Sequence, residues 1–294
     1  MYKDMRKIIM TSEVINSVLN YLKEGKTVPE ISTLLGINKA TISSCLRTHG
    51  IKLFPDKGNV HYFETIDSYA KAYILGFIAA DGALVKTKTT TTLTITVKYE
   101  DKAVLEFIKS EIGNKHKLQE IIRPSSFDKT KTIHHSRYTI SDKYIISDLM
   151  KYGITPNKSL TMGNIINNIP YKYRDAFIIG YFDGDGSVTI REGLYPNERG
   201  ALCRDYSLYI QFRGTYEFLK GICTHLGITE SHIRQHDSIP QLSFANKKDT
   251  YRMFQCYKHL PFYYIRKHDK FLQRINHPSY DKYKQVQTIS SPEN

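Results

Sequence analysis

The chain contains little cysteine and no long hydrophobic run, and each shortage excludes a class of protein. Four cysteines, at positions 45, 203, 223 and 256, are scattered over 294 residues without a C-x-x-C pair. This spacing argues against a disulfide framework or a zinc ribbon and favours a reducing compartment. The longest uncharged apolar run, residues 72–80, is far shorter than the ~20 residues that cross a bilayer, so we expect no membrane partner. The amino-terminal MYKDMRKIIM lacks the apolar core of a signal peptide.

Acidic residues are also in short supply relative to basic ones. The chain has 42 lysines and arginines against 29 aspartates and glutamates, which gives a formal net charge of +13. The basic residues are spread along the whole chain, which favours a polyanionic partner, nucleic acid before an anionic membrane surface. A hydrophobic content of 40% is enough to build two or three domains.

An internal repeat is the strongest pattern in the sequence. The stretch ILGFIAADGA at 74–83 aligns with IIGYFDGDGS at 178–187, at a separation of 185 − 81 = 104 residues. Such self-similarity predicts two copies of one structural unit. The aligned positions are Gly76 with Gly180, Ala80 with Gly184, and Asp81 with Asp185.

Small residues four positions apart give a helix a flat face, so two such helices can pack almost backbone to backbone. We therefore expect the two motif helices to join about a pseudo-twofold axis and to end at the same point. Asp81 and Asp185 then lie close together and repel each other unless a cation sits between them. Oxygen ligands suit Mg²⁺, which in turn suits phosphodiester hydrolysis. Asp183 has the apolar Ala79 as its counterpart, so we interpret it as structural.

The segments after each motif alternate between apolar and polar residues, as half-buried strands do. Each copy reads as helix-strand-strand-helix-strand-strand-helix, which predicts an α+β fold. The apolar faces include Leu93, Ile95 and Val97 in the first copy and Leu208, Ile210 and Phe212 in the second. The residues predicted to face DNA are Thr94, Thr96, Lys98 and Arg137 in the first copy and Tyr209, Gln211, Arg213 and Gln241 in the second.

The motifs ILGFIAADG and IIGYFDGDG resemble the two signature helices of single-chain LAGLIDADG homing endonucleases, over roughly residues 66–277. The resemblance implies two pseudo-symmetric αββαββα subdomains, 66–170 and 171–277, with saddle-shaped antiparallel sheets along the major groove of double-stranded DNA. It implies a monomer that acts as a pseudo-dimer, makes a site-specific double-strand break and is encoded either within an intron or by a free-standing gene. It also implies that Asp81 and Asp185 bind a divalent metal, either Mg²⁺ or another such as Mn²⁺.

The same resemblance implies further catalytic residues. A basic residue is expected just after the closing helix of each half. Lys158 fits in TPNKSLT, and either Arg266 or Lys267 fits in YYIRKHDKF. Gln211 is expected to join the water network of the active site, with Thr96 as its counterpart in the first half.

Residues 1–50 form a separate predicted domain. Two helical segments flank Gly36, and the centre LGINKATIS resembles the helix-turn-helix family, in which the second helix enters the major groove. Residues 51–65, with Pro55 and Gly58, are predicted to be a linker, and residues 278–294 a C-terminal tail. The polar residues predicted to contact DNA are Lys39, Thr41, Ser43, Ser44 and Arg47.

Two other functions use the same core. A sporulation-type DNA-binding regulator has lost the acidic residues, and the presence of both Asp81 and Asp185 argues against that interpretation. An RNA maturase that binds its host intron RNA stays open, because some members of the family both cut DNA and assist splicing. We expect the protein in the cytoplasm or nucleoid of a bacterial or phage-infected cell, or else in an organelle matrix.

Overall fold

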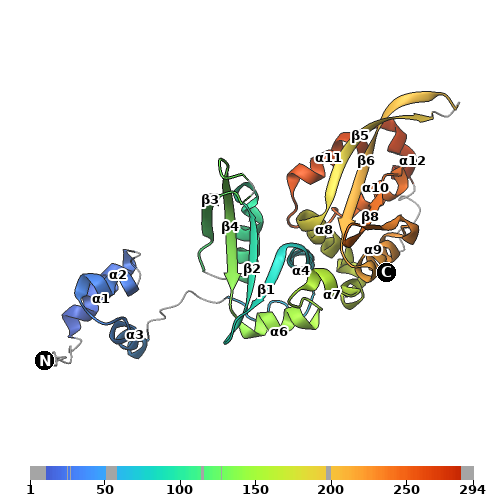
Figure 1. The fold of residues 1–294 in the computed structure, drawn as a ribbon. Helices are drawn as coiled ribbons and strands as arrows, with labels where there is room; N and C mark the ends of the chain where they lie inside the picture. The colour runs from blue at the N-terminus through green and yellow to red at the C-terminus, as the bar shows by residue number, and fades with distance from the viewer. Residues whose placement is uncertain are drawn as a thin grey trace. The chain divides into compact units, whose positions relative to one another are not determined.

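The computed structural model describes residues 11–24, 26, 28–50, 58–113, 116–126, 128–196 and 200–285. The chain divides into two units, residues 1–57 and 58–294 (Figure 1). Within the described residues, no helix is both long and apolar enough to cross a membrane.

The first unit contains three short helices, α1 (Ser12–Lys23), α2 (Val28–Leu35) and α3 (Lys39–Thr48). Gly36 ends α2 with a φ of +64°, the left-handed conformation that glycine adopts without strain. The side chain of Asn38 then caps α3 by accepting a hydrogen bond of 2.8 Å from the backbone N–H of Ala40. The unit has a small hydrophobic core of its own, made of Val18, Ile31, Ile37, Ile42 and Leu46.

The second unit repeats one order of elements. The first copy consists of α4 (Tyr69–Asp81), β1 (Gly82–Lys86), β2 (Thr91–Lys98), α5 (Ala103–Ile112), β3 (Gln119–Pro124), β4 (Thr132–Ile140) and α6 (Lys143–Lys151). The second consists of α8 (Arg174–Asp185), β5 (Ser187–Pro196), β6 (Leu202–Arg213), α9 (Tyr216–Leu226), β7 (Ile233–His236), β8 (Ile239–Phe244) and α10 (Lys247–Gln255). The strands form two antiparallel sheets, in the orders β1-β2-β4-β3 and β5-β6-β8-β7. The predicted α+β repeat is therefore confirmed.

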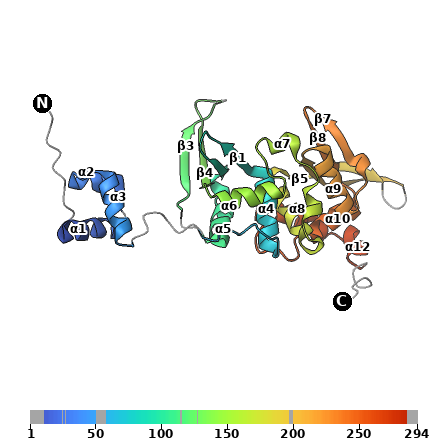
Figure 2. The same ribbon diagram turned by 90° about the horizontal axis from the view of Figure 1, so that it is seen from below.

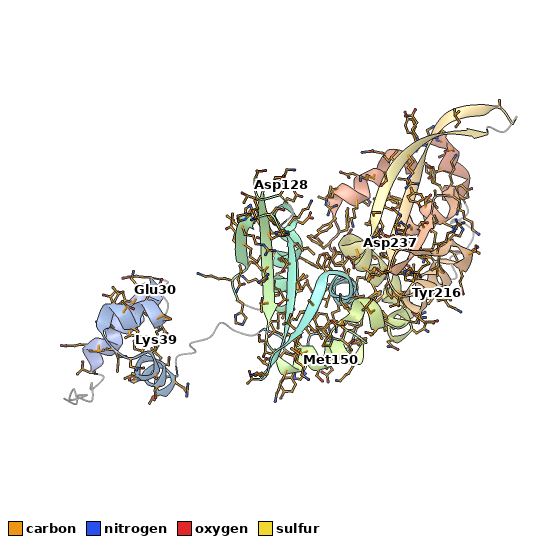
Figure 3. All side chains as sticks on the ribbon, viewed as in Figure 1. Glu30, Lys39, Asp128, Met150, Tyr216 and Asp237 are labelled. Atoms are coloured by element: carbon orange, nitrogen blue, oxygen red, sulfur yellow. The ribbon has the colours of Figure 1, made fainter. Side chains whose placement is uncertain are left out.

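Helices α4 and α8 lie side by side between the two sheets, as two views at right angles show (Figures 1 and 2). Each sheet has one apolar face on the helix layer, where Leu93, Ile95, Leu208 and Ile210 are fully buried. The opposite face carries the alternating polar residues. Figure 3 draws the side chains of both sheets, with Asp128 and Asp237 at the turns of the β3–β4 and β7–β8 hairpins.

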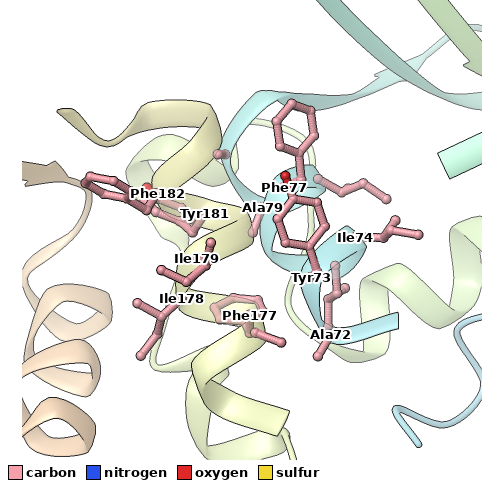
Figure 4. Close-up of a cluster of buried hydrophobic side chains, with 14 of the residues drawn as sticks. Ala72, Tyr73, Ile74, Phe77, Ala79, Phe177, Ile178, Ile179, Tyr181 and Phe182 are labelled. Atoms are coloured by element: carbon pink, nitrogen blue, oxygen red, sulfur yellow. The ribbon is translucent and has the colours of Figure 1, made fainter. Parts of the chain in front are cut away.

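The contact between α4 and α8 is the most extensive contact between two elements of the described structure. A Cβ atom placed on Gly76 would lie 2.0 Å from the carbonyl oxygen of Phe177, and one on Gly180 would lie 2.0 Å from that of Tyr73. The two contacts are equivalent, because each carbonyl belongs to the residue three positions before the glycine of its own helix. Such equivalence is expected for a pseudo-twofold axis. Buried aromatic and aliphatic side chains flank the glycines (Figure 4).

Each half also extends a connecting segment over the other half. After α6 the chain forms α7 (Lys158–Thr161), η2 (Ile165–Asn168) and η3 (Tyr171–Tyr173). In this segment the carbonyl of Met162 accepts a hydrogen bond from the Thr215 hydroxyl at the start of α9. After α10 the chain returns to the first half, where Phe262 stacks on Phe107 at a ring-centroid distance of 5.0 Å. Two exchanged segments therefore join the halves in addition to the central helices.

An ion-pair network ties the start of α8 to two helices of the second half. Asp175 accepts hydrogen bonds of 2.8 Å from His225 on α9 and of 2.7 Å from Arg252 on α10. Burial by itself would raise the pKa of Asp175, but the hydrogen bonds from His225 and Arg252 outweigh burial and hold that pKa well below its usual range. The network stabilises the base of the helix that ends at Asp185.

Two predicted boundaries differ from the folded regions. Residues 51–57 of the predicted linker, with Pro55, lie outside the described residues, while Tyr62 and Phe63 from its second part are buried in the core. The first eight residues of the predicted tail form η5 (Pro278–Tyr280) and α12 (Asp281–Gln285). Tyr280 is buried there, and its hydroxyl lies 3.1 Å from that of Thr250. These segments pack on the core because their aromatic side chains cover its apolar surface.

Candidate functional site

Two carboxylates meet where the central helices end. Asp81 is the last residue of α4, and Asp185 is the last residue of α8. A Cβ atom placed on Gly184 would lie 2.4 Å from the Cβ of Ala80 and 3.3 Å from Cγ of Asp81. The two helix ends are therefore in direct contact, and the small residue at 184 lets them approach. Asp81 is partly exposed and Asp185 is exposed, so both can be reached from solvent.

The glycines that follow the aspartates serve close packing and not a left-handed turn. Gly82 has a φ of −73° and Gly186 a φ of −81°, which are values that any residue adopts. A Cβ atom at Gly82 would lie 2.6 Å from the carbonyl oxygen of Ile78, and one at Gly186 would lie 2.7 Å from that of Phe182. The side chain is excluded because the strand leaves each helix directly over its last turn.

Burial raises the pKa values of both carboxylates, and repulsion by Asp185 adds to the shift at Asp81. Loss of water around Asp81 raises its pKa to about 6, and the negative charge of Asp185 adds to the effect, while Lys267 and Lys158 oppose it. Desolvation also raises the pKa of Asp185, although this residue is the more exposed of the two, and the two lysines again oppose the shift. A cation between the carboxylates would relieve this electrostatic cost.

A buried lysine caps each of the two helix ends. Nζ of Lys158 donates a hydrogen bond of 2.7 Å to the carbonyl of Ala80. Nζ of Lys267, on α11 (Ile265–Ile275), donates to the carbonyls of Phe182, Asp183 and Gly186 at 2.5, 2.9 and 2.6 Å. The positive charges face carbonyls at helix C-termini, where cations are stabilised.

Burial lowers the pKa values of both lysines. Burial lowers the pKa of Lys267 to about 8, against the opposing charge of Asp183. It lowers the pKa of Lys158 as well, against the opposing charges of Asp185 and Asp81.

The structure brings Lys267 to the helix end and directs Arg266 elsewhere. Arg266 forms a paired contact with Asp101, with N···O distances of 2.9 and 3.2 Å, and its side chain is 56% exposed. Neighbouring residues on a helix point in directions about 100° apart, so one faces the site while the other faces outward. Arg266 therefore links the second half to the short helix η1 (Tyr99–Asp101) of the first half.

Asp183 is held as a structural residue in the helix pair. Its Oδ2 accepts hydrogen bonds of 2.8 Å from the hydroxyl of Tyr73 and of 2.8 Å from the backbone N–H of Tyr264. Burial raises its pKa to about 6, although these hydrogen bonds favour the charged form. Both partners belong to contacts between the halves, so Asp183 fastens them together.

The donors at the helix ends fit Mg²⁺ or Mn²⁺ better than zinc. Within the described part of the chain, no group of three or more His, Cys, Asp or Glu side chains could hold a metal ion. Structural zinc sites use four nitrogen or sulfur ligands, whereas Mg²⁺ is often held by one or two carboxylates together with substrate phosphates. Asp81 and Asp185 would supply the protein's share of such a site.

The sheet register places Gln211 beside the site but corrects its expected counterpart. Gln211 pairs with Ser187, whose hydroxyl donates a hydrogen bond of 3.2 Å to the Gln211 side chain. Ser187 corresponds to Ala83, since each is the second residue after a motif aspartate, and Ala83 pairs with Thr94. Thr94 and not Thr96 is therefore the counterpart of Gln211. The β5–β6 hairpin is longer than the β1–β2 hairpin, which hides this correspondence in the sequence.

The predicted DNA-facing strand residues do lie on the polar faces of the two sheets. Their neighbours along the strands are buried, so the strand alternation directs them away from the helix layer. Arg191 also lies on this face and was missed: its guanidinium sits 3.3 Å from the ring centroid of Tyr209. Alternation along 187–191 was the available signal. The predicted residues at half-exposed or exposed positions are Thr94, Thr96, Lys98, Arg137, Tyr209, Gln211 and Arg213, while Gln241 is 8% exposed.

The predicted contact residues of the first unit follow one side of α3. Lys39, Ser44 and Arg47 are exposed, and Thr41 and Ser43 are half-buried. Ile42 and Leu46 fill the small core on the opposite side. The exposed side of α3 is therefore polar and basic.

Comparison with known proteins finds a distant likeness to solved structures. The meganuclease I-SmaMI bound to uncleavable DNA is 14% identical, with a TM-score of 0.46, and the match covers 74% of this chain and 95% of that one. The homing endonuclease I-WcaI bound to its recognition sequence is 14% identical, with a TM-score of 0.48 and coverage of 71% and 90%. The LAGLIDADG homing endonuclease I-LtrWI bound to target DNA is 12% identical, with a TM-score of 0.41 and coverage of 79% and 90%. No family model and no curated protein matches the chain. At this distance the likeness says nothing of function, which depends on the residues of the site itself.

Proposed function

We propose that the chain is a site-specific DNA endonuclease of the LAGLIDADG homing type that makes a metal-dependent double-strand break. The observation that carries the proposal is the meeting of Asp81 and Asp185 at the ends of two helices related by pseudo-twofold symmetry. Two strands of a duplex are also related by approximate twofold symmetry, so one such site between two sheets suits a cut in both strands. The net charge of +13 supports a nucleic-acid partner.

The residues of the site have different roles in the proposed phosphodiester hydrolysis. A divalent cation held by Asp81 and Asp185 would activate water and stabilise the leaving oxygen. Lys158 and Lys267 hold the two helix ends through their carbonyls and would place positive charge near the phosphates of a bound duplex. The polar faces of the sheets would fix the position of the duplex, because strands with alternating side chains fit the major groove.

We propose further that the first unit is a helix-turn-helix domain that lengthens the DNA contact through α3. Two modules on one chain gain affinity because the second binds at a high effective concentration. Removal of residues 1–57 should therefore weaken binding to the full site and leave the cut position unchanged. Footprints and affinities of the two proteins on the same DNA test this, and identical results for both would contradict a role of this unit in target binding.

The nuclease proposal is tested by selection followed by cleavage. Double-stranded DNA enriched from a random library by the full chain is incubated with the protein and Mg²⁺. A double-strand cut within the enriched sequence is expected, and it should disappear when the metal is chelated. Enrichment without any cut would contradict the nuclease and make the protein a DNA-binding regulator.

A further inference from the structure

One row of three side chains crosses the polar face of each sheet at the same place relative to the active site. We use the term cross-strand row for the residues paired side by side on the three strands. In the first half Arg137 pairs with Thr96 on one side and Gln119 on the other. In the second half the middle residue is a glutamine with an arginine on each side. The row of the first half is Thr96, Arg137 and Gln119, and that of the second half is Arg213, Gln241 and Arg234.

The register shows that the two rows are equivalent. Gly82 pairs with Ile95, so Thr96 is the next residue along β2. In the second half Ser187 pairs with Gln211, so the antiparallel register places Gly186 level with Phe212, and Arg213 follows. In each half, the first residue of the row therefore comes one position after the residue that lies level with Gly82 or Gly186.

Both rows lie on the polar face of their sheet and have a width that fits the major groove. Paired residues share a face of the sheet, and the strand neighbours Ile95, Val97, Phe212 and Leu242 are buried on the opposite face. Neighbouring strands are about 4.8 Å apart, so three strands span roughly 10 Å, close to the ~12 Å width of the major groove.

The rows differ in hydrogen-bonding character. In the first half Nε of Arg137 donates to the Thr96 hydroxyl at 3.2 Å, which holds a single guanidinium in place. In the second half Arg213 and Arg234 are exposed on either side of Gln241. Their side chains make no hydrogen bond or ion pair with other residues in the described ranges, so both are available to a ligand. Arginine pairs with guanine through O6 and N7, whereas Gln241, between the two arginines, is only 8% exposed.

We propose that these rows make the two halves of the DNA target unequal at equivalent base pairs. The row of the first half reads one guanine through Arg137. The row of the second half reads two guanines, on either strand, through Arg213 and Arg234, while the buried Gln241 lies between them in the sheet. The proposal rests on the proposed function, because it requires the polar faces to lie on DNA.

Base-by-base preference profiles of the full chain and its variants test the rows. The wild-type profile should show one guanine preference at the first row and two at the second. Arg213→Gln and Arg234→Gln should each lose roughly 5- to 150-fold of discrimination at one base pair of the second half. Both arginines are exposed, so the variants should keep the wild-type circular dichroism spectrum. Lys109→Gln, which removes a charge from the helix layer, is the control and should leave the profile unchanged.

Replacing the row of the first half by the residues of the second row is a more decisive test than the single substitutions. The triple variant Thr96→Arg, Arg137→Gln, Gln119→Arg should change the preference of the first half into that of the second, with the cut position unchanged. If the triple variant still enriches and cuts one unique site but its base-preference profile is unchanged, the assignment of the rows is wrong and the proposed nuclease function stands. If the wild-type chain enriches no sequence, the proposed function is wrong, and the assignment of the rows, which depends on it, is wrong as well.

Discussion

Adding one methyl group at Gly180 should separate the two central helices. A Cβ atom there would lie 2.0 Å from the carbonyl oxygen of Tyr73, whereas ordinary contacts begin at 3.4 Å. Alanine at this position therefore requires a displacement of about 3.4 − 2.0 = 1.4 Å. The obstructing atoms belong to the backbone of α4, so the whole helix has to move.

The displacement has two costs that add. Overpacking of a core costs about 1–3 kcal/mol, and a gap of 0.5–1 Å already removes roughly a quarter to a half of the dispersion energy of the contacts beside it. We expect Gly180→Ala to lower the free energy of unfolding of the second unit by about 3 kcal/mol. For a unit of this size the melting temperature should fall by about 6–12 °C, as measured by calorimetry.

A matched control and a symmetry test accompany this measurement. Gly163 has open space around its Cα, so Gly163→Ala should melt as the wild type does. Gly76→Ala should cost about as much as Gly180→Ala, and the double variant should cost less than the sum, because one displacement relieves both contacts. A melting temperature for Gly180→Ala equal to that of Gly163→Ala would refute the close approach of the helices.

Two further predictions concern ion pairs. Asp175→Asn should destabilise the fold by about 2 kcal/mol, because it leaves Arg252 and His225 without their carboxylate. The pKa of Asp175 is depressed in the folded state, so its contribution is present above about pH 4, the unfolded pKa, and is lost as the pH falls below it. Urea unfolding of both proteins from pH 7 to pH 3 should show the difference shrinking, and a difference that grows would contradict the network. Asp101→Asn should cost less than about 1 kcal/mol in the same assay, because the side chain of Arg266 is 56% exposed. A loss of several kcal/mol would mean that this pair does more than link the surfaces.

The central helix pair was predictable because its signal is local and doubled. Small residues four apart define a flat helix face without any tertiary information, and two copies 104 residues apart identify the partner face. The aspartates follow from the same alignment, since each ends its helix at the same position. The alternation of Leu93, Ile95 and Val97 likewise fixes which strand face is buried.

The surroundings of the site depend on tertiary contacts that leave no such local mark. Helix α11 buries Lys267, Phe271, Arg274 and Ile275 at helical spacing, but two of these are cationic, so a search for apolar periodicity passes over it. The choice of Lys267 over Arg266 depends on carbonyls more than 80 residues away in sequence. The equivalence of Gln211 with Thr94 depends on hairpin length, which only the register reveals.

The central claim is that Asp81 and Asp185 together form a metal-dependent cutting site whose function is separate from DNA binding. The most direct test measures cleavage and affinity on one selected DNA site for the wild type, Asp81→Asn and Asp185→Asn across a Mg²⁺ titration. Each variant is expected to lose double-strand cleavage at every Mg²⁺ concentration while its gel-shift affinity stays close to that of the wild type. Full cleavage by either variant would contradict the claim.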